Sequence, residues 1–168
     1  MPYVREILAD GHPTLRKVAK KVDPKEIGEP LFQQLIDDMF ETMYAAPGVG
    51  LAAPQVNVSK RLFVMDVHDD EHPPAVLINP KFEKLEEEEE LREGCLSVPG
   101  KVGDIVRYKY AAVSGLDRHG RKIRVEGEGL LAQCLQHEID HLDGKLYIDR
   151  AANLRDAATD EEKETAEA

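Results

Sequence analysis

The sequence contains no tryptophan, only 5% aromatic residues and two cysteines among its 168 residues. Cys95 and Cys134 are too few for a disulfide framework, and residues 1–13 lack the unbroken apolar stretch of a secretory signal. We therefore expect free thiols and a protein that stays in the cytoplasm. Apolar runs such as Leu62–Met65 are far shorter than the roughly 18 residues that span a bilayer, which excludes an integral membrane protein.

Basic residues are also scarce, with 22 Lys and Arg against 33 Asp and Glu, for a net charge of −11. Most of this charge lies in two segments, −5 in Glu83–Glu93 and −4 in Arg155–Ala168, so the rest of the chain is nearly neutral. Binding to a phosphate backbone depends on clustered Lys and Arg, which the sequence does not provide. We therefore expect no direct nucleic-acid partner.

The length allows one domain with a buried core and leaves no room for a second. We expect this domain to cover residues 1–150. Residues 151–168 are acidic and have no large apolar residue after Leu154. This composition predicts a C-terminal tail that is a frayed helix or disordered.

Hydrophobic periodicity predicts a mixed α+β fold with antiparallel strands in the middle of the chain. Residues 46–56 are rich in Gly and Pro and predict an ordered loop that lets the backbone approach a partner closely. Helices are expected over residues 11–22, 30–44 and 130–142, and strands over residues 62–67, 75–78, 106–117 and 122–126.

The most specific chemical pattern is H-E-x-x-H at residues 137–141. His137 and His141 are one helical turn apart, so both imidazoles can bind one metal ion, and Glu138 is placed to act as general base. Leu130 and Cys134 share the same helix face at spacings of seven and three residues before His137.

A catalytic metal of this kind needs a third protein ligand. No histidine follows His141, which leaves the carboxylates of the tail or Cys95. Cys95 is favoured because Gly, Ser and Pro around it predict a shaped turn, and a thiolate ionises readily on a divalent cation. Cys134 fits better as a small buried hydrophobe.

Three segments together resemble the signature motifs of the peptide deformylase family. They are G-V-G-L-A-A-P-Q at residues 48–55, E-G-C-L-S at residues 93–97, and Q-H-E-I-D-H-L at residues 136–142. The resemblance extends from about residue 5 to 150, so the expected domain is a deformylase-like catalytic domain. It implies hydrolytic removal of the N-formyl group from the initiator methionine of nascent polypeptides, with release of formate.

The resemblance also implies roles for individual residues. Cys95, His137 and His141 would hold one divalent metal ion, and Glu138 would take a proton from the attacking water and pass it to the departing amine. The Gln55 side-chain amide and the Leu96 backbone N–H would stabilise the oxyanion. The resemblance favours Fe²⁺, although the same donors suit Zn²⁺, Ni²⁺ or Co²⁺.

Further residues are candidates for holding the N-formylmethionyl peptide. Gly48, Val49 and Gly50 are expected to form a glycine-lined edge on which an extended peptide docks. Leu130 and Cys134 either line the methionine pocket or belong to the core of the metal-bearing helix. Gln133, which lies next to them in the sequence, puts a polar side chain where a thioether favours an apolar one.

The resulting hypothesis is an α+β metalloenzyme whose antiparallel β-sheets surround a central helix carrying the H-E-x-x-H motif. One rival is a metallopeptidase with a tail carboxylate as third ligand, and another is a catalytically silent module that binds nascent chains. Contact with the ribosome stays open. The acidic tail argues against docking through a basic C-terminal helix.

Overall fold

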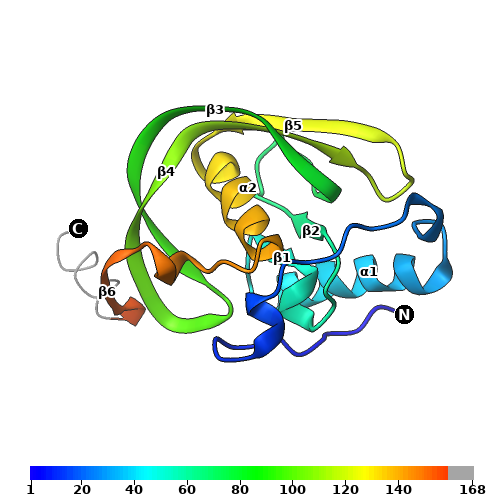
Figure 1. Ribbon diagram of the computed structural model, residues 1–168, viewed down its shortest axis with the longest axis horizontal. Helices are drawn as coiled ribbons and strands as arrows, with labels where there is room; N and C mark the ends of the chain where they lie inside the picture. The colour runs from blue at the N-terminus through cyan, green and yellow to red at the C-terminus, as the bar shows by residue number, and fades with distance from the viewer. Residues whose placement is uncertain (159–168) are drawn as a thin grey trace.

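In a computed structural model, residues 1–158 are described, and they form a curved antiparallel sheet and two α-helices (Figure 1). The strand order is β1-β2-β3-β4-β5, and β6 pairs with β4. The elements are β1 Gly50–Ala52, β2 Leu62–Met65, β3 Ala75–Cys95, β4 Val98–Leu116, β5 Lys122–Glu128, β6 Ala152–Asp156, α1 Pro30–Ala45 and α2 Gly129–Leu142. This confirms the α+β class.

The sheet bends around α2, which lies inside the curve of the long β3–β4 hairpin (Figure 1). Leu131, Leu135 and Ile139 on α2 belong to one buried cluster with sheet residues such as Phe63 and Val113. Burying the apolar faces of the helix and the sheet against each other stabilises both elements. The predicted helix over residues 130–142 and its position within the sheet are therefore confirmed.

Helix α1 closes the other side of the core. Pro30 occupies its first turn, where the missing N–H of proline costs no hydrogen bond. Its buried stripe, which includes Leu35, Ile36 and Met39, packs in a second cluster with residues of β1 and β2 such as Leu51 and Val64. The helix predicted over residues 30–44 is confirmed and extends to Ala45.

The β3–β4 hairpin is much longer than the sequence pattern predicts. β3 has 21 residues and β4 has 19, where strands over 75–78 and 106–117 were expected. The run of glutamates at 86–90 hides the extension because it has no apolar alternation, yet all of these residues except Glu87 pair with β4, as in Glu88 opposite Tyr108. The backbone ladder, not side-chain burial, holds this part of the strand.

Two predictions of local structure were wrong. The helix expected over residues 11–22 is only a 3₁₀ turn, Pro13–Arg16, because the following backbone is used in tertiary bonds: Ala19 N–H donates to Leu142 O at 2.8 Å. The tail expected to fray or be disordered instead forms β6 over Ala152–Asp156, paired with Lys101 and Val102 of β4. Residues 159–168 of that tail lie outside the described residues.

The ordered loop predicted over residues 46–56 contains β1 and a 3₁₀ helix, Ala53–Val56. Strands were correctly expected near Leu62–Met65 and Lys122–Glu128. Two further 3₁₀ helices, Pro24–Glu26 and Tyr147–Asp149, were not anticipated. No helix in the described part of the chain is both long and apolar enough to cross a bilayer.

A substitution at Gly144, which follows α2, tests how closely the end of that helix packs against the backbone of Arg16. The φ of Gly144 is +73°, and a Cβ there would lie 2.6 Å from the backbone oxygen of Arg16. Gly120 is a matched control, because its φ is +79° while the nearest atom would be 4.0 Å away. Gly120→Ala should lose about 1–2 kcal/mol from left-handed backbone strain. Gly144→Ala should lose a further ~1–3 kcal/mol by overpacking. Urea unfolding checks this, and equal losses would contradict the close approach.

Candidate active site

Three parts of the fold converge on the site. Cys95, which the sequence analysis expected within a turn, is the last residue of β3, and the turn follows it at Leu96 and Ser97. His137, Glu138 and His141 come from α2, and Gln55 comes from the 3₁₀ helix after β1. The alternation of β3 and the periodicity of α2 turn these side chains toward one another.

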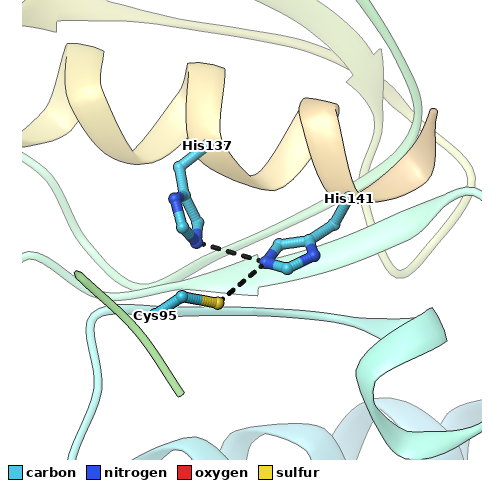
Figure 2. A group of neighbouring side chains, drawn as sticks. All are labelled: Cys95, His137 and His141. Atoms are coloured by element: carbon cyan, nitrogen blue, oxygen red, sulfur yellow. Dashed lines mark hydrogen bonds between the residues drawn. The ribbon is translucent and has the colours of Figure 1, made fainter. Parts of the chain in front are cut away.

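Cys95, His137 and His141 form a compact donor group (Figure 2). Cys95 Sγ lies 3.3 Å from His141 Nε2, which lies 3.2 Å from His137 Nε2. All three donor atoms are within 4.8 Å of one another, and among residues 1–158 this is the one such group found. One thiolate and two imidazoles are suitable donors for a divalent transition metal. The structure brings together the ligands that the sequence favoured.

Glu93 orients one of the two histidines. Its Oε2 accepts a hydrogen bond from His137 Nδ1 at 2.7 Å, which turns Nε2 of His137 toward His141 and Cys95. Burial raises the pKa of Glu93, but hydrogen bonds from His137 and Arg107 outweigh it and bring the pKa to about 2. Glu93 is therefore an ionised carboxylate inside the protein.

Arg107 on β4 supports Glu93 and was missed by the sequence analysis. Its guanidinium donates to both oxygens of Glu93, from Nε at 2.9 Å and from Nη2 at 2.5 Å. It also donates from Nη1 to Asp140 Oδ2 at 2.7 Å. The one signal in the sequence was strand alternation, which places Arg107 on the same buried face as Ile105.

Glu138 is buried beside the donor group. It is 3% exposed, and its Oε1 has no hydrogen-bond partner within the described chain. Its Oε2 lies 3.9 Å from His137 Nε2. Burial, which disfavours the ionised form, raises the pKa of Glu138 to about 7. The carboxylate can therefore take up or release a proton near neutral pH.

The pKa values of His137 and His141 are shifted in opposite directions, although burial acts on both. Burial lowers the pKa of each, but contacts with Cys95 and Glu93 outweigh it at His137 and raise its pKa. At His141, burial and the neighbouring His137 both lower the pKa, and Nδ1 of His141 has no partner among residues 1–158. Two facing Nε2 atoms at 3.2 Å cannot both carry a proton, so at least one is a free electron-pair donor.

Gln55 is held rigidly with its amide toward the cysteine. Its Oε1 accepts from Ala52 N–H at 3.0 Å, and its Nε2 donates to Ser97 Oγ at 3.0 Å and lies 3.8 Å from Cys95 Sγ. Gln55 is 1% exposed, which excludes a solvated loop residue. Ser97, which the sequence analysis left without a role, holds this amide and donates its own N–H to Cys95 Sγ at 3.4 Å.

Close approach requires glycine at position 50, whereas at Gly48 only the end of the flexible Leu96 side chain would have to move. A Cβ on Gly50 would lie 2.6 Å from Glu138 Oε2 and 2.8 Å from Cys134 Sγ, and a Cβ on Gly48 would lie 2.9 Å from Leu96 Cδ1. The backbone of this segment therefore passes directly over the general base candidate. Only glycine leaves that much room.

These residues line a cleft of about 370 Å³. Leu130, 48% exposed, and Cys134, 4% exposed, lie along it, so Cys134 is both core and lining. His141 is buried and is not among the lining residues. The predicted site residues that line the cleft are Gly48, Val49, Gly50, Gln55, Cys95, Leu96, Leu130, Cys134, His137 and Glu138.

The Arg107–Glu93 pair gives a stability prediction. Both side chains are buried, so Arg107→Ala leaves the Glu93 charge without its main partner and should cost about 3–5 kcal/mol of unfolding free energy. Arg124→Ala is the control, because Arg124 pairs with Glu126 at the surface, where solvent weakens the attraction. Urea unfolding should show a large loss for Arg107→Ala alone. Small and similar losses of unfolding free energy in the two variants would mean that the Arg107–Glu93 pair does not stabilise the fold.

Comparison with known proteins gives one consistent result. The sequence model described as polypeptide deformylase matches residues 4–157. A peptide deformylase of Azotobacter vinelandii is 52% identical over 150 residues, covering 89% of this chain and 88% of the relative. One of Pseudomonas aeruginosa is 50% identical over 153 residues, covering 90% and 89%.

Solved structures agree with the sequence relatives. A peptide deformylase from Legionella pneumophila has a TM-score of 0.83 at 49% identity, covering 89% of this chain and 87% of that one. One from Synechococcus elongatus, solved in complex with actinonin, has a TM-score of 0.82 at 45% identity, covering 89% and 81%. The chain therefore belongs to the polypeptide deformylase family.

Proposed function

We propose that the cleft between β1, the end of β3 and α2 is where this enzyme acts on its substrate. The chain is a metal-dependent hydrolase that removes the N-formyl group from the N-terminal methionine of newly made polypeptides and releases formate, as its family does. The observation that carries this placement is the convergence of Cys95, His137 and His141 beside the buried carboxylate of Glu138.

Cys95, His137 and His141 would hold one divalent metal ion. Their donor types fit such an ion, and the Glu93 hydrogen bond keeps the His137 ring in the orientation that presents Nε2. A bound metal ion would supply Lewis acidity, polarising the formyl oxygen and lowering the pKa of a nearby water.

Glu138 is the proton carrier in this proposal. Its carboxylate takes a proton from the water that attacks the formyl carbon, and gives that proton to the amine nitrogen as the C–N bond breaks. Burial supports this role because it raises the proton affinity of the carboxylate toward the operating pH. The products are formate and a free N-terminal amine.

Gln55 and Leu96 are proposed as the oxyanion donors. The Gln55 amide is already fixed by Ala52 and Ser97, and its long 3.8 Å contact with Cys95 Sγ can be exchanged for a bond to the substrate oxygen. A donor that is held in place before the reaction costs no reorganisation during it. The backbone N–H of Leu96 lies in the adjacent turn.

The 48–50 segment is proposed to hold the substrate backbone. β1 is at one end of the strand order, and its partner there is β2, so an extended peptide could add to its other edge. Gly48, Val49 and Gly50 would make those backbone contacts. Leu130 and Cys134 would then lie beside the methionine side chain.

Two substitutions test the reaction and the site together. Formate release from a formyl-Met-Ala-Ser peptide should fall to background in Cys95→Ala, which lacks a metal ligand. It should fall by about 10²–10⁴-fold in Glu138→Ala, which lacks the base. Iron and zinc content measured in the same samples separates the two causes, because Glu138→Ala should keep its metal.

The same experiment distinguishes the rival functions. A metallopeptidase with a tail carboxylate as third ligand would keep its metal and activity in Cys95→Ala and would cleave internal peptide bonds. A silent binding module would give no formate in the wild type and would bind the peptide equally well in Glu138→Ala. Either pattern would refute the proposed reaction.

We further propose that Fe²⁺ is the native metal, because the family resemblance favours it and the donor set accepts it. Cys95 beside ferrous iron is exposed to oxidation. Protein purified without oxygen should therefore release formate faster than protein purified in air, and added Zn²⁺ should restore only part of the activity. Activity that is indifferent to oxygen and highest with Zn²⁺ would rule out this assignment.

The proposed substrates place the enzyme in the cytoplasm, where new polypeptides are made, and the free thiols of Cys95 and Cys134 agree with a reducing compartment. A contact with the ribosome, if the enzyme makes one, would use a surface other than a basic C-terminal helix. The segment Arg155–Ala168 carries a net charge of −4, and its first two residues belong to β6.

A further inference from the structure

Gln133 lies on α2 one turn before His137 and lines the cleft beside Leu130 and Cys134. The proposed substrate side chain is apolar, and an amide at the wall of its pocket gains nothing from that contact. Leu or Met at this position would bury more apolar surface against the substrate. Packing against methionine therefore does not explain the glutamine.

The amide nitrogen of Gln133 makes two hydrogen bonds across the cleft floor to β3. Nε2 donates to the backbone oxygen of Arg92 at 2.9 Å and to Glu93 Oε1 at 3.3 Å. The other oxygen of Glu93 accepts from His137 Nδ1 at 2.7 Å. Gln133 is thus a direct neighbour of the carboxylate that orients His137.

Glu93 is held from two directions. Arg107 bonds it from β4, and Gln133 bonds it from α2. Arg107 comes from the sheet, although it also bonds Asp140 of α2. His137 bonds the Glu93 carboxylate from α2, and Gln133 adds a second bond from the same helix one turn earlier. Two points of α2 therefore fix its spacing from the end of β3 at the level of the donor group.

We infer that Gln133 is a positioning residue that links the side-chain pocket to the Glu93–His137 pair. Because one side chain both lines the pocket and bonds the carboxylate, its placement sets the room for the substrate and the orientation of His137 together. The inference rests on the proposed function for the identity of the substrate, and on the assignment of His137 as a ligand.

Gln133→Met tests this inference, because methionine keeps the length and unbranched shape of glutamine and lacks a donor. The probe is Zn²⁺ alone, titrated into the metal-free protein against a chelator. We expect Zn²⁺ affinity to fall by up to about tenfold, the low end of the cost of removing a direct partner of a metal ligand, because Gln133 acts on His137 through Glu93. With formyl-Met-Ala-Ser, kcat should fall by a similar factor, while KM should not rise, because methionine adds apolar surface to the pocket.

Gln34→Met is the matched control. Gln34 on α1 also uses Nε2 for two bonds, to Met1 O at 3.1 Å and to Asp38 Oδ1 at 2.7 Å, so the same chemical change is made outside the site. Its Zn²⁺ affinity should equal that of the wild type. Gln133→Leu repeats the test if Gln133→Met does not fold.

The outcomes are separable from those of the proposed function. Unchanged Zn²⁺ affinity and kcat in a folded Gln133 variant, with or without a change in KM, would overturn the inference and leave Gln133 as pocket lining only. Failure of the wild type to release formate would refute the proposed function. The zinc titration would still decide whether Gln133 positions the donor group.

Discussion

The buried carboxylate of Glu93 is the point at which the sheet and the catalytic helix are joined. It accepts hydrogen bonds from Arg107 of β4 and from Gln133 and His137 of α2. An ionised group inside a protein is costly unless its partners replace the lost water, so Glu93, its arginine and its helix must assemble together or not at all. Burial alone would raise its pKa, and the hydrogen bonds from His137 and Arg107 instead hold that pKa at about 2.

Strand and helix geometry explain why this junction also creates the donor group. Glu93 and Cys95 are two residues apart at the end of β3, where the pairing with β4 becomes irregular between Gly94 and Cys95. Both side chains face α2, since Glu93 bonds His137 and Cys95 Sγ contacts His141. His137 and His141 are four apart on α2 and share one helix face. Docking those two faces through Glu93 and His137 brings the thiol within 3.3 Å of the second imidazole without a further device. The curvature of the long β3–β4 hairpin around α2 makes this docking possible (Figure 1).

The difference between local periodicity and long-range contacts also explains how much of the fold and the site could be predicted from the sequence. The H-E-x-x-H helix and α1 have strong local periodicity, and Cys95 stands in a composition typical of turns, so sequence alone located the donors. Arg107 was missed because its partners are 14 and 33 residues away and nothing local marks it as buried. The length of β3 was missed because consecutive glutamates carry no burial pattern, although the backbone ladder continues through them. β6 escaped notice because its five residues gain their order from pairing with β4 rather than from their own propensity.

The site also shows where stability is given up. Among the described residues, the buried side-chain polar atoms without a partner are Glu138 Oε1, His141 Nδ1 and Tyr147 Oη, all near the donor group. An unpartnered buried polar atom costs about 1–3 kcal/mol, a large share of the stability of a small domain. In the proposed reaction Glu138 exchanges a proton with the substrate, and an oxygen that no side chain of the protein occupies is free to do so. The glycine at position 50 serves the same end, because any side chain there would occupy the space over that carboxylate. The Glu93 junction and the two buried clusters therefore supply the stability of the fold around the cleft.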